Sequence, residues 1–458
     1  MSSDSPNPSP TILISGLPPK TLVGIDLLSF TSTPNFHGIR DLPAGAHFLY
    51  TGTTESFSLR CGEWLFVSDN CSGLGLTSAE IRLRKWNGEL EALVPVDERK
   101  DEERQEAMER RANLGSIWHA GGLLAYRTRW EEKQNGQGEA KEEGLDADTL
   151  ARGDWQRLTE HITPAVLDRI LGPGELGSEQ KPRWIVTSAS SAPCDVDNIP
   201  GLSSSTTGAG GVAGEQEKEL HFLPIDLKKT WREGAIGRER TEAALDKSWA
   251  LGNFVDSFKA EAQANQIQNA SGLEPGEVQC LGEMQFTFLM VLTLMNFSCL
   301  EQWKRLLSLF LKCRAAIVAR EEFFVRMLQI LRIQLAHCND VEGGLFEMDG
   351  DDGGTMLKKL LTGFCRSVDD VIADQQSRVK SELIQLEEWV KKEFGWELRK
   401  GYIVRRGMLE LEDGEQVEMD TSDIEEEEET GEYAPVVVDL ENVGRSSEDL
   451  EVSDMPDP

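Results

Sequence analysis

The sequence lacks the motifs that mark most metal centres and catalytic sites. None of its eight cysteines belongs to a C-x-x-C motif, and no histidine lies at zinc-ligand spacing. The six histidines have no H-E-x-x-H or G-x-S-x-G context, and no cofactor motif is present. We therefore expect no metal, no cofactor and no enzymatic activity. An enzyme whose site is assembled only in the fold, in a cleft between domains, stays open as an alternative.

Positive charge is also scarce. The chain has 47 Lys and Arg against 80 Asp and Glu, and its net charge is −33. Non-specific binding to nucleic acid depends on basic side chains that neutralise phosphates, so no direct nucleic-acid site is expected. The last 50 residues, 409–458, hold 20 of the acidic residues and a single Arg445, which leaves the preceding part only moderately acidic. This balance suits protein partners.

No apolar segment reaches the roughly 20 residues that a bilayer core demands. The longest apolar run without a charge has 17 residues, lies between Glu283 and Glu301, and contains the polar residues Gln285 and Asn296. We interpret this run as one buried helix that leads into a second, and we expect no membrane contact.

The cysteine pattern and the first residues predict an intracellular location. Cys299, Cys313 and Cys365 occupy apolar positions of helical segments, where a reduced cysteine acts as a small hydrophobic residue. The first ten residues have neither a basic region nor an apolar region of a secretory signal. We expect a monomer in the cytoplasm and nucleus.

The residue patterns predict a multidomain protein with separate β and α parts. Short β-branched and aromatic runs between Thr11 and about Val96 predict antiparallel strands in a sandwich or barrel-like sheet. Apolar residues at helical spacing between 155 and 170 predict helices that cover the sheet, and RWIVTSAS predicts a late strand. From about Arg238 to Trp396 the pattern predicts five or six antiparallel helices in a bundle or solenoid-like domain.

Shifts in composition predict the domain boundaries. Residues 188–219 are rich in Ser, Gly and Thr, which is typical of a flexible linker, and the last part of the chain is acidic and poor in apolar residues. The expected order is a disordered segment 1–10, an N-terminal β-rich domain 11–187, a flexible insertion 188–219, a connecting segment 220–237, a C-terminal α-helical domain 238–400, and a disordered acidic tail 401–458.

One apolar island interrupts the acidic tail. Residues 433–440 contain a β-branched run that predicts a strand, either added to the exposed sheet edge of a partner or docked on this chain itself. The residues expected to bind in this way are Pro435, Val436, Val437, Val438, Asp439 and Leu440. Ser422 and Ser446 each precede acidic residues, so both are candidate phosphorylation sites that would weaken docking of the strand.

Two sets of residues resemble a known family. The first contains a GID strand, an aromatic-x-Gly-Ile step, a Pro-x-Gly turn and an HFL strand, with Gly38 and Gly45 expected at turns. Its residues are Gly24, Ile25, Asp26, Phe36, Gly38, Ile39, Pro43, Gly45, His47, Phe48 and Leu49. The second set combines LGE-x-QF with W-K-R-L-L and comprises Leu281, Gly282, Glu283, Gln285, Phe286, Trp303 and Lys304. Together with APVVVDL in the tail, they resemble the Aar-two family.

That resemblance implies a splicing factor that helps to assemble the U-five small nuclear ribonucleoprotein. In the family, the tail and both domains clamp the RNase-H-like and Jab/MPN-like domains of the Prp-eight scaffold, which excludes the Brr-two RNA helicase until assembly is complete. The resemblance says nothing about the insertions 131–149 and 188–219 or the acidic run 409–431. A general acidic adaptor with no role in splicing is the other open alternative.

Overall fold

The computed structural model describes most of the chain outside its tail. The described residues are 9–54, 59–68, 80–126, 153–176, 181–193, 219–259, 272–341, 343–348, 354–372, 376–399, 406–410 and 416–420. Contacts separate the chain into two units, 1–398 and 399–458, and each is described by itself.

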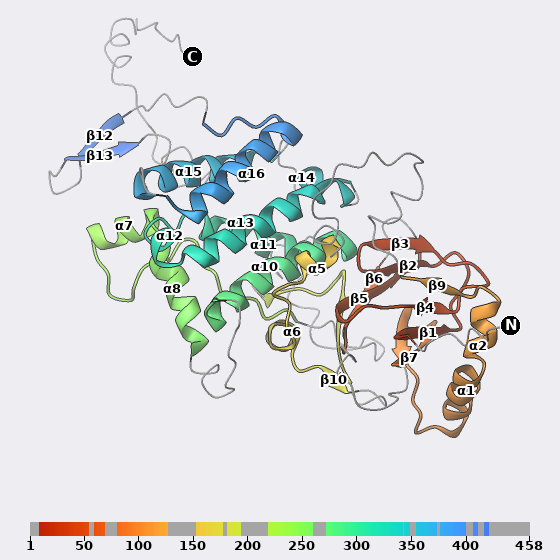
Figure 1. The fold of residues 1–458 in the computed structure, drawn as a ribbon. Coiled ribbons are helices and arrows are strands. Elements are labelled where there is room, and N and C mark those ends of the chain that lie inside the picture. The colour runs from red at the N-terminus through yellow and green to blue at the C-terminus, as the bar shows by residue number, and fades with distance from the viewer. Residues whose placement is uncertain are drawn as a thin grey trace, which may run out of the picture. The chain divides into compact units, whose positions relative to one another are not determined.

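The strands form two sheets in the first unit (Figure 1). The five-stranded sheet has the order β8-β7-β1-β4-β9, and the six-stranded sheet has the order β10-β11-β6-β5-β2-β3. Their bounds are β1 Thr11–Ser15, β2 Leu22–Ile25, β3 Leu28–Thr31, β4 Gly38–Arg40, β5 Gly45–Gly52, β6 Arg60–Val67, β7 Ile81–Asn87, β8 Ala92–Pro95, β9 Leu123–Ala125, β10 Glu175–Leu176 and β11 Pro182–Thr187. The expected strands between Thr11 and Val96 are confirmed, as is the late strand.

The expectation of purely antiparallel pairing was wrong for one sheet. β1 pairs with β7 in parallel, and β4 pairs with β9 in parallel, whereas every pair in the six-stranded sheet is antiparallel. Parallel neighbouring strands need a long crossover connection. Here the crossover from β1 to β7 contains most of the strands of the six-stranded sheet. Strand spacing alone does not reveal such a crossover.

The two sheets pack face to face over one apolar core. Ile12 and Ile14 of β1 meet Val23, Leu49 and Leu65 of the six-stranded sheet, and all five side chains are buried. The outer face of the five-stranded sheet is covered by α1 (Asp101–Ala112) and α2 (Leu114–His119), with Ala107 pressed against it. α1 is otherwise charged, as expected for a helix with one small buried position.

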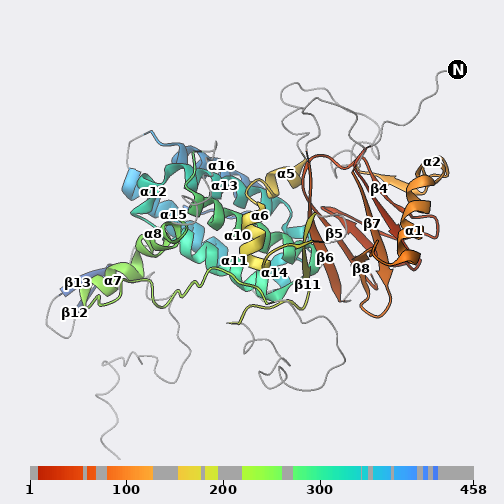
Figure 2. The same ribbon diagram turned by 90° about the horizontal axis from the view of Figure 1, so that it is seen from below.

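Helices cover the opposite face of the six-stranded sheet. These are α5 (Asp154–Leu158), α6 (Pro164–Leu171) and α10 (Pro275–Leu294), which share a core with Phe48, Trp64 and Trp184. The sequence pattern ran through 155–170 as one stripe, but Pro164 opens a separate helix capped by the Thr163 side chain. Figure 2 shows the resulting layers, from α1 and α2 through both sheets to α5, α6 and α10.

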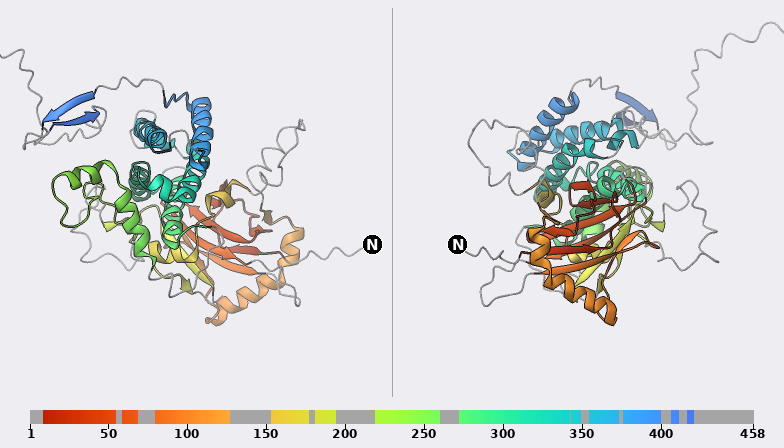
Figure 3. Two further views of the ribbon diagram at one scale, coloured as in Figure 1. Left: turned by 60° about the vertical axis from the view of Figure 1, so that its left-hand side comes forward. Right: turned by 90° about the vertical axis from the view of Figure 1, so that its right-hand side faces the viewer.

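The remaining helices form the α-helical region. They are α7 Arg238–Leu245, α8 Ser248–Ser257, α11 Phe297–Phe310, α12 Ala316–Ala319, α13 Glu321–Ala336, α14 Leu345–Met348, α15 Thr355–Ile372 and α16 Arg378–Phe394. In Figure 3, the blue α15 and α16 lie on the side of the green α10 and α11 that faces away from the red strands. None of the helices in the described ranges is long and apolar enough to span a membrane.

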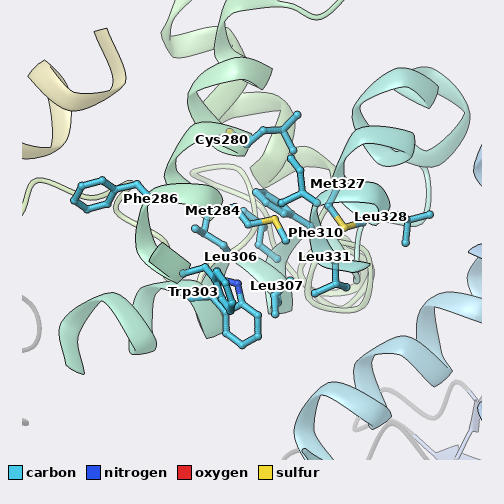
Figure 4. Packing of buried hydrophobic residues seen from close by; sticks show 14 of the residues in the cluster. Cys280, Met284, Phe286, Trp303, Leu306, Leu307, Phe310, Met327, Leu328 and Leu331 are labelled. Atoms are coloured by element: carbon cyan, nitrogen blue, oxygen red, sulfur yellow. The ribbon is translucent and has the colours of Figure 1, made fainter. Parts of the chain in front are cut away.

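The pair α10 and α11 forms the centre of this region and confirms the expected buried helix that leads into a second one. α10 is buried on nearly every side and ends at Met295 in the left-handed conformation, after which the Asn296 side chain caps α11. Met284 of α10, Leu306 of α11 and Met327 of α13 meet in one apolar cluster (Figure 4). Cys299, Cys313 and Cys365 are buried, as the apolar pattern predicted.

Two features were not predicted from composition. Residues 188–193, grouped with the linker, pack against the start of α11, where Asn296 donates hydrogen bonds to the carbonyls of Thr187 and Ser190 at 3.0 and 2.7 Å. In the second unit, β12 (Arg406–Glu410) and β13 (Gln416–Asp420) form an antiparallel hairpin.

Candidate functional site

The GID and HFL motifs meet in a buried polar cluster between the sheets and α5. Asp26 follows β2 with a φ of 56°, and its carboxylate accepts hydrogen bonds from His47 Nδ1 at 2.7 Å and the Phe48 N–H at 2.8 Å. The Tyr126 hydroxyl donates to the same carboxylate at 2.6 Å. His47 Nε2 lies 2.8 Å from the Pro43 carbonyl. The motifs therefore fix the loop that leads into β5.

This geometry favours the protonated form of the His47 ring. Both of its nitrogens face acceptors, a carboxylate and a carbonyl, and only the protonated ring can donate to both. Burial alone would lower the pKa of His47, but the charge and hydrogen bond of Asp26 and the hydrogen bond to Pro43 outweigh it, so the pKa is raised. With both nitrogens engaged, His47 holds the fold together and is not positioned as a general base.

Two motif glycines allow close packing of backbone and rings. A Cβ on Gly24 would lie 1.9 Å from the ring of Tyr50, which lies opposite it on β5. A Cβ on Gly38 would lie 2.1 Å from the Ile12 carbonyl, so Gly38 belongs to strand β4 and not to the expected turn. Gly45 was also expected at a turn, but it is the first residue of β5, with a φ of 134° that other residues rarely adopt.

The second motif set centres on Glu283 of α10, which is fully buried. Its carboxylate accepts hydrogen bonds from Arg169 of α6 at 2.6 Å, from the Leu223 N–H at 3.1 Å and from the Gln302 amide of α11 at 2.7 Å. Gln302 also donates to the Leu223 carbonyl at 3.0 Å. One carboxylate thus joins two helices of the α-helical region to α6 and to the segment that follows the insertion.

Neighbouring motif residues attach α10 to the chain that covers the six-stranded sheet. Gln285 accepts from the His161 N–H and donates to the Arg157 carbonyl, both at 2.8 Å. A Cβ on Gly282 would lie 2.6 Å from the His161 carbonyl, so only glycine permits this approach. Phe286 packs 6.2 Å from the ring of Trp64. Leu281 is fully buried in the same core.

The W-K-R-L-L residues serve the α-helical region itself. The Trp303 indole donates to Gln334 at 2.9 Å, and Gln334 in turn donates to the Met284 carbonyl at 3.1 Å. Lys304 is partly exposed and pairs with Glu301 at 3.1 Å. The two parts of the second motif, distant in sequence, therefore converge on one side of α10.

A cleft of about 520 Å³ lies beside the His47 cluster, between the start of β5 and α5. Pro43, Ala46, Phe66, Tyr126 and Trp155 are among its lining residues. Across the described ranges, no group of three or more His, Cys, Asp and Glu side chains is arranged to hold a metal ion. The volume of the cleft falls within the range of small-molecule binding sites.

The sequence reasoning missed several residues that complete these clusters. Tyr126, Arg169 and Leu223 contact motif residues through space, and no local pattern marks them. The tail residues Pro435 to Leu440, Ser422 and Ser446 lie outside the described residues, and their roles stay predictions.

The motif residues hold a two-sheet region and an α-helical region together through buried polar contacts. Two family models match this chain: the AAR2 N-terminal domain over residues 8–172 and the AAR2 C-terminal repeat region over residues 222–399. The chain belongs to the AAR2 family, the Aar-two family that its motifs resemble. Membership implies a non-catalytic role in assembly of the U-five small nuclear ribonucleoprotein.

Similar proteins with the name Protein AAR2 homolog cover most of the chain. The human protein is 25% identical over 394 residues, which are 84% of this chain and 89% of the human protein. The mouse protein is 25% identical over 399 residues, with the same coverage of both chains. The Caenorhabditis elegans protein is 22% identical over 346 residues, which are 71% of this chain and 78% of the nematode protein.

Proposed function

We propose that this protein is an assembly chaperone and placeholder of the U-five small nuclear ribonucleoprotein. It binds the RNase-H-like and Jab/MPN-like domains of the Prp-eight scaffold and keeps the Brr-two helicase off until maturation. The observation that carries this proposal is the match of both AAR2 models, which together cover residues 8–172 and 222–399. As a factor of this kind, the protein works in the cytoplasm and nucleus, as a monomer and without a cofactor.

We propose that the folded part and the tail make different contacts with the scaffold. The folded part offers a rigid surface because buried contacts such as Arg169–Glu283 and Gln285–His161 tie α10 to α6 and to the loop before it, which cover the six-stranded sheet. Residues 435–440 of the tail bind by strand addition, with backbone hydrogen bonds for affinity and alternate side chains for specificity. Exclusion of the helicase is then steric and needs no nucleotide site.

A pull-down with the RNase-H-like and Jab/MPN-like domains of the scaffold tests the proposal. Full-length protein is compared with a truncation that ends at Asp420, after the hairpin β12–β13. We expect the full-length chain to bind both domains and the truncation to lose most of its Jab/MPN-like contact. Failure of both proteins to bind either domain would contradict the proposal.

A pair of tail variants separates strand addition from charge. Val436→Asp with Val438→Asp places two carboxylates on one face of the expected strand, and Val443→Asp with Val452→Asp adds the same charge outside it. Only the first variant should lose binding and admit the helicase to the scaffold domain. Equal loss in both would show that the tail acts through its charge, as a general acidic adaptor would.

A further inference from the structure

The start of β5 runs past the end of its neighbour β2. β2 pairs with β5 only from Leu49 to Gly52, whereas the other neighbour, β6, follows β5 back to Gly45. Phe48 directs its N–H and C=O to the β2 side, where both bond to Asp26 at 2.8 and 2.9 Å. Because backbone groups alternate along a strand, Ala46 directs its own groups to the same side.

This uncovered edge of β5 faces the 520 Å³ cleft. The Ala46 carbonyl accepts a hydrogen bond at 2.7 Å from the indole of Trp155, a residue on the α5 side of the cleft. Among the described residues, no strand covers the β2 side of positions 45 to 48. The His47–Pro43 hydrogen bond holds the adjoining loop in place. Asp26 already bonds both backbone groups of Phe48, and Trp155 bonds the Ala46 carbonyl. The Ala46 N–H and the second lone pair of the Ala46 carbonyl are therefore the backbone groups with which a segment in this hollow of ligand size can pair.

The cleft combines an apolar floor with acidic charge. Phe66, Trp155 and Ile162 contribute apolar surface, and Asp41 and Glu160 contribute carboxylates. No Lys or Arg is found among the described residues that line it. Asp41 pairs with Arg40 at 2.6 Å, and Glu160 pairs with Arg326 at 3.6 Å. Each ion pair uses one oxygen of the carboxylate, and the side chains of Asp41 and Glu160 are 39% and 48% exposed. A cationic side chain can therefore approach either carboxylate from solvent.

We propose that this cleft binds an extended peptide segment of a partner protein. The segment adds to the edge of β5 at Ala46, places an apolar side chain over Phe66 and Trp155, and directs Lys or Arg to Asp41 and Glu160. The proposal concerns the folded part of the chain and does not depend on strand addition by residues 435–440.

Binding of short synthetic peptides to the full-length chain tests the proposal. The probes are fluorescein-labelled Lys-Val-Phe-Val-Lys, its charge-reversed form Glu-Val-Phe-Val-Glu, and a form of the first with an N-methylated phenylalanine, which cannot pair as a strand. Fluorescence anisotropy should show at least tenfold tighter binding of the basic peptide than of either other probe. Hydrogen–deuterium exchange should slow at residues 43–48 when the basic peptide is bound.

Variants locate the binding. Ala44→Trp, at an exposed position of the lining, should fill the cleft and abolish binding without disturbing the core. Asp41→Asn with Glu160→Gln should weaken binding of the basic peptide about tenfold, whereas Glu89→Gln with Glu91→Gln, an equal charge change at an exposed turn, should not. Absence of binding, equal binding of the charge-reversed peptide, or unchanged binding by Ala44→Trp would overturn the proposal.

The chain's own insertion is the competing occupant, because residues 127–152 connect the lining residues Tyr126 and Gly153. If it fills the cleft, residues 43–48 will be protected from exchange in the free protein, and deletion of 131–149 will expose them. That result would also overturn the proposal. Pull-down of the scaffold domains by the Ala44→Trp variant tests the assembly function separately. A failure of the cleft proposal can therefore be told apart from a failure of the proposed assembly function.

Discussion

Gln302 donates a hydrogen bond to Glu283 at 2.7 Å, between the facing sides of α11 and α10. Glu283 belongs to LGE-x-QF and Gln302 directly precedes W-K-R-L-L, so the contact joins the two motif segments on either side of the break at Met295. Because Glu283 also accepts from Arg169 and Leu223, the pair links the α-helical region to α6 and the connecting segment. The buried carboxylate thus acts at the point where the main parts of the folded chain meet.

Glu283→Ala should lower the free energy of unfolding by about 3–5 kcal/mol, since it removes one acceptor from the part-buried Arg169 and from the buried Leu223 N–H and Gln302 amide. Denaturation by urea, followed by circular dichroism, measures the change. Glu301→Ala is the matched control on the neighbouring helix, where the carboxylate is 27% exposed and pairs with Lys304. That control should cost no more than about 1 kcal/mol. Equal losses would refute a special role for Glu283.

Two helical glycines should respond to alanine with opposite signs. A Cβ on Gly282 would lie 2.6 Å from the His161 carbonyl, so Gly282→Ala should destabilise the fold by about 1–3 kcal/mol through overpacking. Gly363 of α15 is exposed and has open space around its Cα, so Gly363→Ala should stabilise by about 0.5–1 kcal/mol. Thermal and urea unfolding of the two variants checks both signs. Stabilisation by Gly282→Ala would show that α10 does not pack closely on residue 161.

His47 should make stability fall as pH rises. Its pKa is raised in the folded state, so its contribution is complete below its unfolded pKa of about 6.5 and is lost as pH rises through the folded pKa. The free energy of unfolding of the unmodified protein minus that of His47→Gln should therefore shrink as pH rises above about 6.5. His337, whose pKa is also raised, is common to both proteins and cancels. Exposed His221→Gln provides the control, and a difference that grows with pH would contradict the ion pair.

Added negative charge near the tail strand should weaken binding to the scaffold. We expect Ser422→Asp with Ser446→Asp to reduce affinity for the Jab/MPN-like domain about two- to fivefold, through like-charge repulsion in a tail that already carries −19 over residues 409–458. Ser203→Asp with Ser205→Asp adds the same charge in the Ser/Gly-rich insertion and should leave affinity unchanged. Titration of the purified domain measures both. Equal affinity of the tail variant and the original chain would remove the serines as switch sites.

The sequence by itself determined the local structure of this protein and its family. Short β-branched runs and long helical stripes carry periodicities of 2 and 3.6, so the positions of most strands and of α10 and α11 followed from the pattern. The spacing of the motifs was likewise enough to reveal the resemblance to the AAR2 family. These signals are local, and they persist whatever the rest of the chain does.

Only the tertiary structure decided how those elements are connected and what the motif residues contact. The parallel pairing of β1 with β7 depends on a crossover of more than 60 residues that no local pattern records. Tyr126 reaches Asp26 across 100 positions, and Arg169 reaches Glu283 across 114. Buried polar groups bond to the partners that are desolvated beside them, and which groups lie side by side depends on how the whole chain packs.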